Sequence, residues 1–233
     1  MKVFYLFQQA YKWGFFTTLK FIYHELLSMF QKRNELIFIS NAELFSEIKD
    51  YVNFKSTDIT SHGPVPIPII RNSFKKLPKH IFQYSLVDFG SGSGRVLIEA
   101  LKNGFNKVYG YEISKKLYEV SVKNITDQNF EKNTIIYNKN FLDWKYEEGQ
   151  RVFFIYNTSS KQVIDFLIEN LKQKYIELGL NFWIIYVTPE QDEIFQSEFF
   201  EKIFSKVNRH GNGFCIYKFI PLRQNTIKQD NDE

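Results

Sequence analysis

Two hydrophobic patterns alternate along the chain beyond residue 80. Short, almost continuous apolar runs are followed by longer segments in which apolar residues return every three or four positions. The short runs are typical of strands buried in a parallel sheet, and the longer segments are typical of amphipathic helices. Strands are therefore predicted at 84–89, 107–113, 134–137, 151–156 and 181–188, and helices from Arg95, over 114–129 with Ser114 as the N-cap, and over 161–178.

The pattern changes near the C-terminus. Residues 190–197 fit a short helix, and residues 199–207 and 213–220 are separated by a polar, glycine-bearing segment, which predicts a closing antiparallel hairpin. Residues 222–233 are polar and are expected to be a disordered tail. The order of elements predicts an α/β fold.

The first 55 residues form an N-terminal helical extension in this interpretation. Over residues 1–31, apolar and aromatic residues recur at helical spacing, and residues 41–55 fit a second short helix. Charged residues such as Lys12 and Lys20 interrupt every apolar window long enough to cross a membrane. Two readings remain: the helix packs on the domain or a second protomer, or it lies on an anionic membrane surface.

Composition and charge disfavour one class of partner and exclude several kinds of site. The 233 residues carry a net charge of +4 without a basic stripe, so nucleic acid is a disfavoured partner. A single cysteine, Cys215, rules out an internal disulfide and a cysteine-rich zinc site. The four histidines show no ligand spacing, and no metal site is predicted.

A glycine-rich turn between the first predicted strand and its helix is the main candidate site. Asp88 ends the strand, and glycines follow at 90, 92 and 94. Such a turn lets a ligand approach the backbone and aims helix N–H groups at it. Arg95 stands where the dinucleotide fingerprint needs its third glycine, and no P-loop lysine follows. The next strand also ends in an acid, Glu112, which can accept hydrogen bonds from ribose hydroxyls.

This acid-x-Gly-x-Gly-x-Gly turn, with an acid ending the following strand, resembles motif I of the class I S-adenosylmethionine-dependent methyltransferases. The resemblance spans roughly residues 58–220. It implies a Rossmann-like seven-stranded sheet with an antiparallel last strand, and S-adenosyl-L-methionine as cofactor. By the same resemblance, the cofactor-binding residues include Asp88, Gly90, Ser91, Gly92, Ser93, Gly94, Glu112 and Ile113.

Residues 56–68 precede the turn and hold three prolines at alternate positions, which predicts an extended segment. The segment resembles one that precedes motif I in small prokaryotic methyltransferases and related protein-lysine methyltransferases. That likeness implies that Pro64–Pro68, with Pro66 at the centre, walls the methionine end of the cofactor, near His62. A plain linker is the alternative. Residues 69–77, which follow, are predicted to form the first helix of the domain.

The third strand leads to Asn140 and Phe141, where members of the family carry Gly-Asp-hydrophobic. The side-chain oxygen of Asn140 can accept a hydrogen bond from an adenine amino group, and Asp143 is the alternative. Phe141 and Trp144 fit core packing as well as adenine stacking.

The fourth strand delivers Tyr156 and Asn157 to the edge where ligands of open α/β sheets bind. These two residues match the Tyr-Asn-Pro-Phe of the small group, but Thr158 and Ser159 replace its Pro-aromatic pair. Asn157 can orient an acceptor amine or hydroxyl, whereas Ser159 or Ser160 fits a helix cap.

The predicted function is methyl transfer to an unidentified acceptor, with a protein lysine amine as the first candidate. A small-molecule or glycan hydroxyl, or a cofactor-binding scaffold without catalysis, are the alternatives. Tyr156, Asn157 and His62 are the candidate catalytic residues. The predicted division is 1–55 for the extension, 56–221 for the cofactor-binding domain and 222–233 for the tail. The protein is predicted to be cytoplasmic, and residues 1–31 are the candidate segment for peripheral contact with the inner membrane surface.

Overall fold

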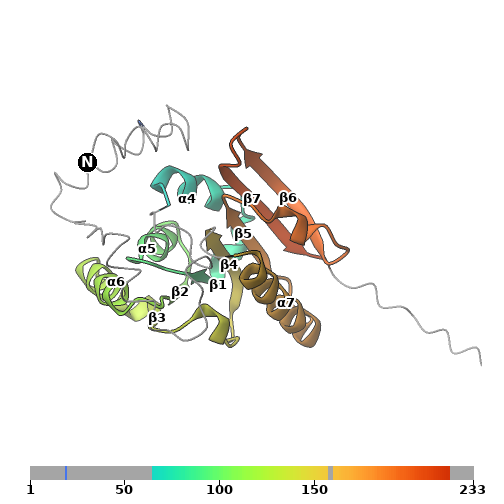
Figure 1. The fold of residues 1–233 in the computed structure, drawn as a ribbon. Coiled ribbons are helices and arrows are strands. Elements are labelled where there is room, and N and C mark those ends of the chain that lie inside the picture. Colours follow the sequence, from blue (N-terminus) through green and yellow to red (C-terminus); the bar gives the residue numbers. More distant parts are fainter. Residues whose placement is uncertain (1–18, 20–64, 157–159, 221–233) are drawn as a thin grey trace, which may run out of the picture.

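A computed structural model describes residue 19, residues 65–156 and residues 160–220 of the protein (Figure 1). The predicted helices at 1–31 and 41–55 and the tail at 222–233 lie outside these residues, apart from residue 19, so they stay predictions, as does the division into three parts.

In the described part of the chain, seven strands form one sheet in the order β3-β2-β1-β4-β5-β7-β6. The strands β1 to β5 run parallel, whereas β7 pairs antiparallel with β5 and with β6. The predicted seven-stranded sheet with an antiparallel closing hairpin is therefore confirmed. The bounds are β1 Ser85–Phe89, β2 Lys107–Tyr111, β3 Thr134–Tyr137, β4 Gln150–Tyr156, β5 Trp183–Val187, β6 Phe200–Val207 and β7 Gly213–Phe219.

Helices cover both faces of the sheet (Figure 1). One core cluster combines residues of α4, α5 and α6 with one side of the strands, and a second combines α7 with the other side. The central strands β1, β4 and β5 are thus covered on both faces, which explains their nearly continuous apolar sequences. The bounds are α4 Ile67–Phe74, α5 Arg95–Lys102, α6 Lys115–Asp127 and α7 Lys161–Leu178.

Most elements follow the predicted bounds closely. The helix α7 spans 161–178 as predicted, and the Ser114 hydroxyl caps α6 by accepting a hydrogen bond from Leu117 N. The short helix after β5 is a 3₁₀ turn at Asp192–Phe195.

The prediction that the chain stays extended through Pro68 is wrong. The helix α4 begins at Ile67, so Pro68 lies in its first turn. The first N–H groups of a helix have no intrahelical acceptor, and a proline there loses nothing. The helix also ends at Phe74, before the predicted Leu77.

Candidate cofactor site at the carboxyl edge of the sheet

The glycine-rich turn is tied to the neighbouring strand by its backbone. The N–H groups of Gly90 and Ser91 both donate to the carbonyl oxygen of Tyr111, at 2.9 Å each. Gly90, Gly92 and Gly94 have φ values of 83°, 53° and 81°, in the left-handed region that glycine adopts without strain. The turn therefore leaves β1, crosses the end of β2 and enters α5.

Glu112 closes the turn from the side of β2. One carboxylate oxygen accepts a hydrogen bond from Gly92 N at 2.7 Å, and the other accepts one from Ser114 N at 2.8 Å. The side chain is buried. These two bonds use two of the about four acceptor positions of a carboxylate, and they aim the acid across the mouth of the glycine turn.

Asp88 lies beneath the same turn, next to Gly110 of β2. It is buried, and loss of hydration together with the nearby negative charge of Glu112 raises the pKa of Asp88 well above its ordinary value. Two carboxyl groups, Asp88 and Glu112, thus border one turn from two adjacent strands. Such a pair can bind the hydroxyl or cationic groups of a ligand at this edge.

The residues that follow β3 border the candidate site on another side. The Asn140 side-chain oxygen accepts a hydrogen bond from Leu142 N at 3.0 Å and caps the 3₁₀ turn Phe141–Asp143. Phe141 is half-buried with its ring 5.9 Å from that of Phe89, and Asp143 is exposed. Asn140 is therefore already engaged in a local cap, and a further bond to a ligand would use its remaining lone pair.

Trp144 belongs to the core. It is buried, its indole N–H donates to Gln150 Oε1 at 3.0 Å, and its ring packs edge-on against Phe153. The core-packing interpretation of Trp144 is confirmed.

The end of β4 reaches the same edge, and the structure describes the residues there only in part. Tyr156 ends β4, is half-buried and pairs with Val187 of β5. Asn157, Thr158 and Ser159 lie outside the described residues, as does His62, so their proposed roles stay predictions. Ser160 occupies the N-cap position of α7, as one of the two predicted alternatives has it, but its hydroxyl makes no capping bond to the helix. The other alternative, Ser159, lies outside the described residues and stays a prediction.

The segment before α4 lies beside the start of α5. Val65 and Pro66 are buried, and the Arg95 guanidinium donates to the Val65 carbonyl oxygen at 3.4 Å. Since Arg95 directly follows Gly94, the described end of the proline-bearing segment is close to the glycine turn.

Asn138 is one residue of this edge that sequence reasoning missed. Its side-chain amide donates to the carbonyl oxygens of Glu112 and Ile113, at 2.9 and 3.1 Å, and so joins the exit of β3 to that of β2. The available signal was its position directly after a predicted strand, at the ligand-binding edge.

Within residues 65–156 and 160–220, no group of three or more His, Cys, Asp or Glu side chains is placed to hold a metal ion. None of the helices there has both the length and the hydropathy needed to cross a bilayer.

No protein-family model matches the sequence, and no curated protein is significantly similar to it. Solved structures do match the fold. The Escherichia coli protein yhhF, provisionally described as a methyltransferase, superimposes with a TM-score of 0.54 at 16% identity, covering 65% of this chain and 86% of its own. HI0767 from Haemophilus influenzae, provisionally described as a methylase, gives 0.52 at 16% identity, over 66% and 97% of the two chains.

A ribosomal protein L11 methylase from Lactobacillus delbrueckii subsp. bulgaricus matches with a TM-score of 0.50 at 14% identity, over 69% of this chain and 80% of its own. The chain has the class I methyltransferase fold. At these identities the likeness extends to the fold, and the chemistry is argued from the site itself.

Proposed function

We propose that the protein is an S-adenosyl-L-methionine-dependent methyltransferase. The observation that carries the proposal is the position of Glu112, whose carboxylate is held across the glycine turn by Gly92 N and Ser114 N. A carboxylate fixed at this point can accept hydrogen bonds from both hydroxyls of a ribose. The backbone of Gly90–Gly94 then lies against the rest of the same ligand, where a side chain would obstruct it.

The bordering residues fit the other parts of this cofactor. Asp88 offers a buried carboxyl group for a cationic amino group, and binding such a cation would compensate for the burial of the charge. Ile113, Asn140 and Phe141 offer an apolar contact, an amide oxygen and an aromatic ring to the adenine. Ser91 and Ser93 contribute the backbone between the glycines, and Pro66 would wall the far end.

The protein's contribution to the reaction is mainly alignment. When bound, the cofactor supplies an activated methyl group, whose bond to sulfur breaks as the bond to the acceptor forms. Holding the two reactants in line can replace a strong base, because effective molarities of well-oriented reactants reach about 10⁵–10⁸ M. Tyr156, which ends β4, and Asn157, which follows it in the sequence, are proposed to orient the acceptor, and His62 is proposed to take its proton.

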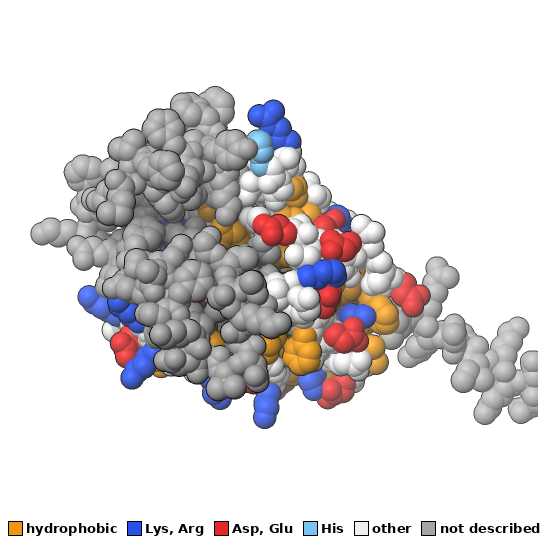
Figure 2. Space-filling view, viewed as in Figure 1, with side chains coloured by type: hydrophobic (Ala, Val, Ile, Leu, Met, Phe, Trp, Pro, Cys, Tyr) orange, Lys and Arg blue, Asp and Glu red, His pale blue; other side chains and the backbone are white. Residues whose placement is uncertain are grey.

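A protein amine is the first acceptor class to test. Tyr156 ends β4, the strand next to β1, and Asn157 follows it in the sequence with an amide oxygen that can orient an amine. One matching structure is a methylase of a ribosomal protein. On the visible surface that grey atoms leave uncovered, acidic and basic side chains are interspersed (Figure 2). A mixed surface of this kind favours a protein acceptor over a nucleic acid.

The deciding experiment is a calorimetric titration with S-adenosylmethionine and S-adenosylhomocysteine. Micromolar binding is expected for the wild type and its loss for Gly92→Arg and Glu112→Ala, with near-native circular dichroism as the control for folding. Absence of binding by the wild type would refute the proposal. Transfer of labelled methyl groups to separated protein, RNA and glycan fractions would then assign the acceptor class.

A further inference from the structure

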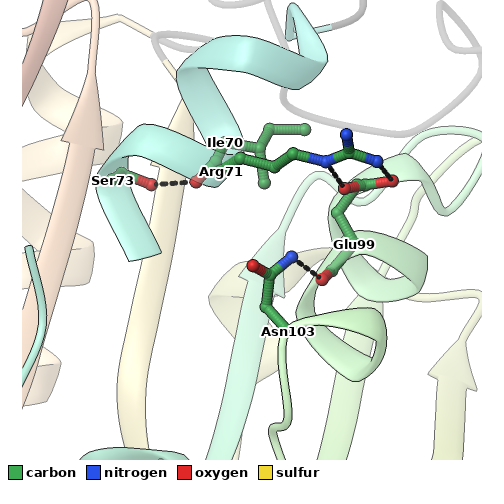
Figure 3. Close-up of polar contacts among 5 residues, drawn as sticks. All are labelled: Ile70, Arg71, Ser73, Glu99 and Asn103. Atoms are coloured by element: carbon green, nitrogen blue, oxygen red, sulfur yellow. Dashed lines mark hydrogen bonds and ion pairs between the residues drawn. The ribbon is translucent and has the colours of Figure 1, made fainter. Parts of the chain in front are cut away.

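The helix α4 is held against α5 by an arginine from each side. From α4, Arg71 extends over α5 and forms a two-point ion pair with Glu99, Nε to Oε2 at 2.5 Å and Nη2 to Oε1 at 3.1 Å (Figure 3). From the first position of α5, Arg95 reaches back to the carbonyl oxygen of Val65, just before α4.

The Arg71–Glu99 pair is asymmetric in its exposure. The Glu99 side chain is 4% exposed and the Arg71 side chain 40%. The buried carboxylate raises the pKa of Arg71, so the guanidinium stays charged. A buried carboxylate needs a fixed partner, and a planar guanidinium bound at two points fixes direction as well as distance.

The pair also lies where it can affect the glycine turn. Glu99 stands one helical turn beyond Arg95, which directly follows Gly94. Arg71 stands about one turn into α4, and the Ile69 and Ile70 amides of this turn donate back to the Pro66 carbonyl oxygen. Moving α4 away from α5 would therefore move Val65 and Pro66 away from the turn.

We propose that Arg71 and Glu99 are positioning residues for the cofactor: their ion pair holds α4 on α5 and thereby keeps Val65 and Pro66 beside the glycine turn. The proposal rests on the proposed function, since it assumes that S-adenosylmethionine binds at this turn. The proposal assigns neither residue a direct contact with the cofactor. Their effect on affinity passes through the placement of the segment that begins α4.

The test is calorimetry of S-adenosylhomocysteine with Arg71→Met, Arg71→Lys and Glu99→Gln. Arg71→Met removes the charge and both bonds, and the affinity is expected to fall about 3- to 30-fold, the range typical of couplings transmitted through contacts. Arg71→Lys keeps the positive charge but loses the planar group that bonds at two points, and Glu99→Gln keeps one of the two acceptor oxygens. Each variant should therefore retain part of the affinity for S-adenosylhomocysteine.

Two controls separate positioning from general stability. Lys174→Met breaks the exposed Lys174–Glu177 pair on α7 and should leave the affinity unchanged. Ile168→Val loosens the core on the α7 face and should lower Tm without weakening binding. If Ile168→Val lowers the affinity as much as an Arg71 variant of equal Tm, the role of the pair is structural and the proposal fails.

Hydrogen exchange supplies an independent readout. In the wild type, S-adenosylhomocysteine should slow the exchange of the Ile69 and Ile70 amides, which donate to Pro66 O, and in Arg71→Met this protection should shrink. Wild-type binding with equal affinity in Arg71→Met and unaltered exchange in α4 would overturn the positioning role alone. No binding by the wild type would overturn the proposed function, and the positioning role with it.

Discussion

Aromatic rings pack against one another in both halves of the sheet, but the two halves differ in the side-chain hydrogen bonds at their carboxyl edge. In the half formed by β1, β2 and β3, side chains such as Glu112 and Asn138 bond to backbone groups at the carboxyl edge. In the half formed by β4, β5, β7 and β6, aromatic rings pack on one another, including Phe153 against Phe182 and Phe195 against Tyr217.

This difference explains where the sequence carries a recognisable motif. A ligand held by backbone groups requires glycines and a fixed acid at set positions, so the first half carries a readable signature. The second half needs only apolar residues of suitable volume in its core, and many sequences satisfy that requirement. Its edge, where the acceptor is proposed to bind, departs from the family pattern at Thr158 and Ser159.

The largest expected effect on stability lies in the half formed by β4, β5, β7 and β6. Phe182 is fully buried among the rings of Phe153, Tyr175 and Phe219. Phe182→Ala should lower the free energy of unfolding by about 3–5 kcal/mol, through lost burial and the cavity left behind. Urea denaturation measures the loss, and titration well below the transition should find unchanged affinity for S-adenosylhomocysteine. A large fall in that affinity would show that the halves are energetically coupled.

Two glycines with left-handed φ, one in each half, form a matched pair. At Gly94 an added Cβ would stand 2.5 Å from Ser121 Oγ, whereas at Gly179, after α7, it would meet nothing within 4 Å. Gly94→Ala should therefore cost about 2–4 kcal/mol and abolish cofactor binding, and Gly179→Ala about 1–2 kcal/mol with binding intact. Equal effects of the two changes on binding would contradict the special role of the turn.

Asp88 gives a prediction of pH dependence. Burial, and next the charge of Glu112, raise the pKa of Asp88, so the folded state disfavours its ionised form. Stability should accordingly fall as pH rises from the ordinary value of 3.8 towards the raised native pKa. Asp88→Asn should thus raise Tm at pH 7, with the gain disappearing near pH 3–4, and should weaken cofactor binding. A lower Tm at pH 7 would show that the carboxylate is stabilised in the fold.

The smallest expected change in stability comes from Asn138→Ala. Loss of the two bonds to the carbonyl oxygens of Glu112 and Ile113 should cost about 1 kcal/mol, as for ordinary hydrogen bonds. Because these bonds hold the exit of β2, binding of S-adenosylhomocysteine should weaken as well. Asn133→Ala is the matched control, since its amide donates to Asn106 O at the opposite edge of the sheet. Equal loss of affinity in both variants would contradict this role.

Much of the fold followed from local pattern. The bounds of α7 and β3 and the Ser114 cap were predicted because each depends on neighbours within a few residues. The start of α4 was predicted two residues late, because the three alternate prolines indicate an extended segment through Pro68. A proline is compatible with the first turn of a helix, and Pro68 lies there.

The sequence alone determined most of the strands, the closing hairpin and most of the residues that border the glycine turn, because hydrophobic period and glycine spacing are local properties. Only the tertiary structure decided what those residues contact. Glu112 is bonded to Gly92, 20 positions away, and Arg71 to Glu99, 28 positions away, and no local pattern encodes which distant groups meet. Those pairings arise when the β2 exit comes to lie beside the turn and α4 packs on α5, and they depend on the packing of the whole domain.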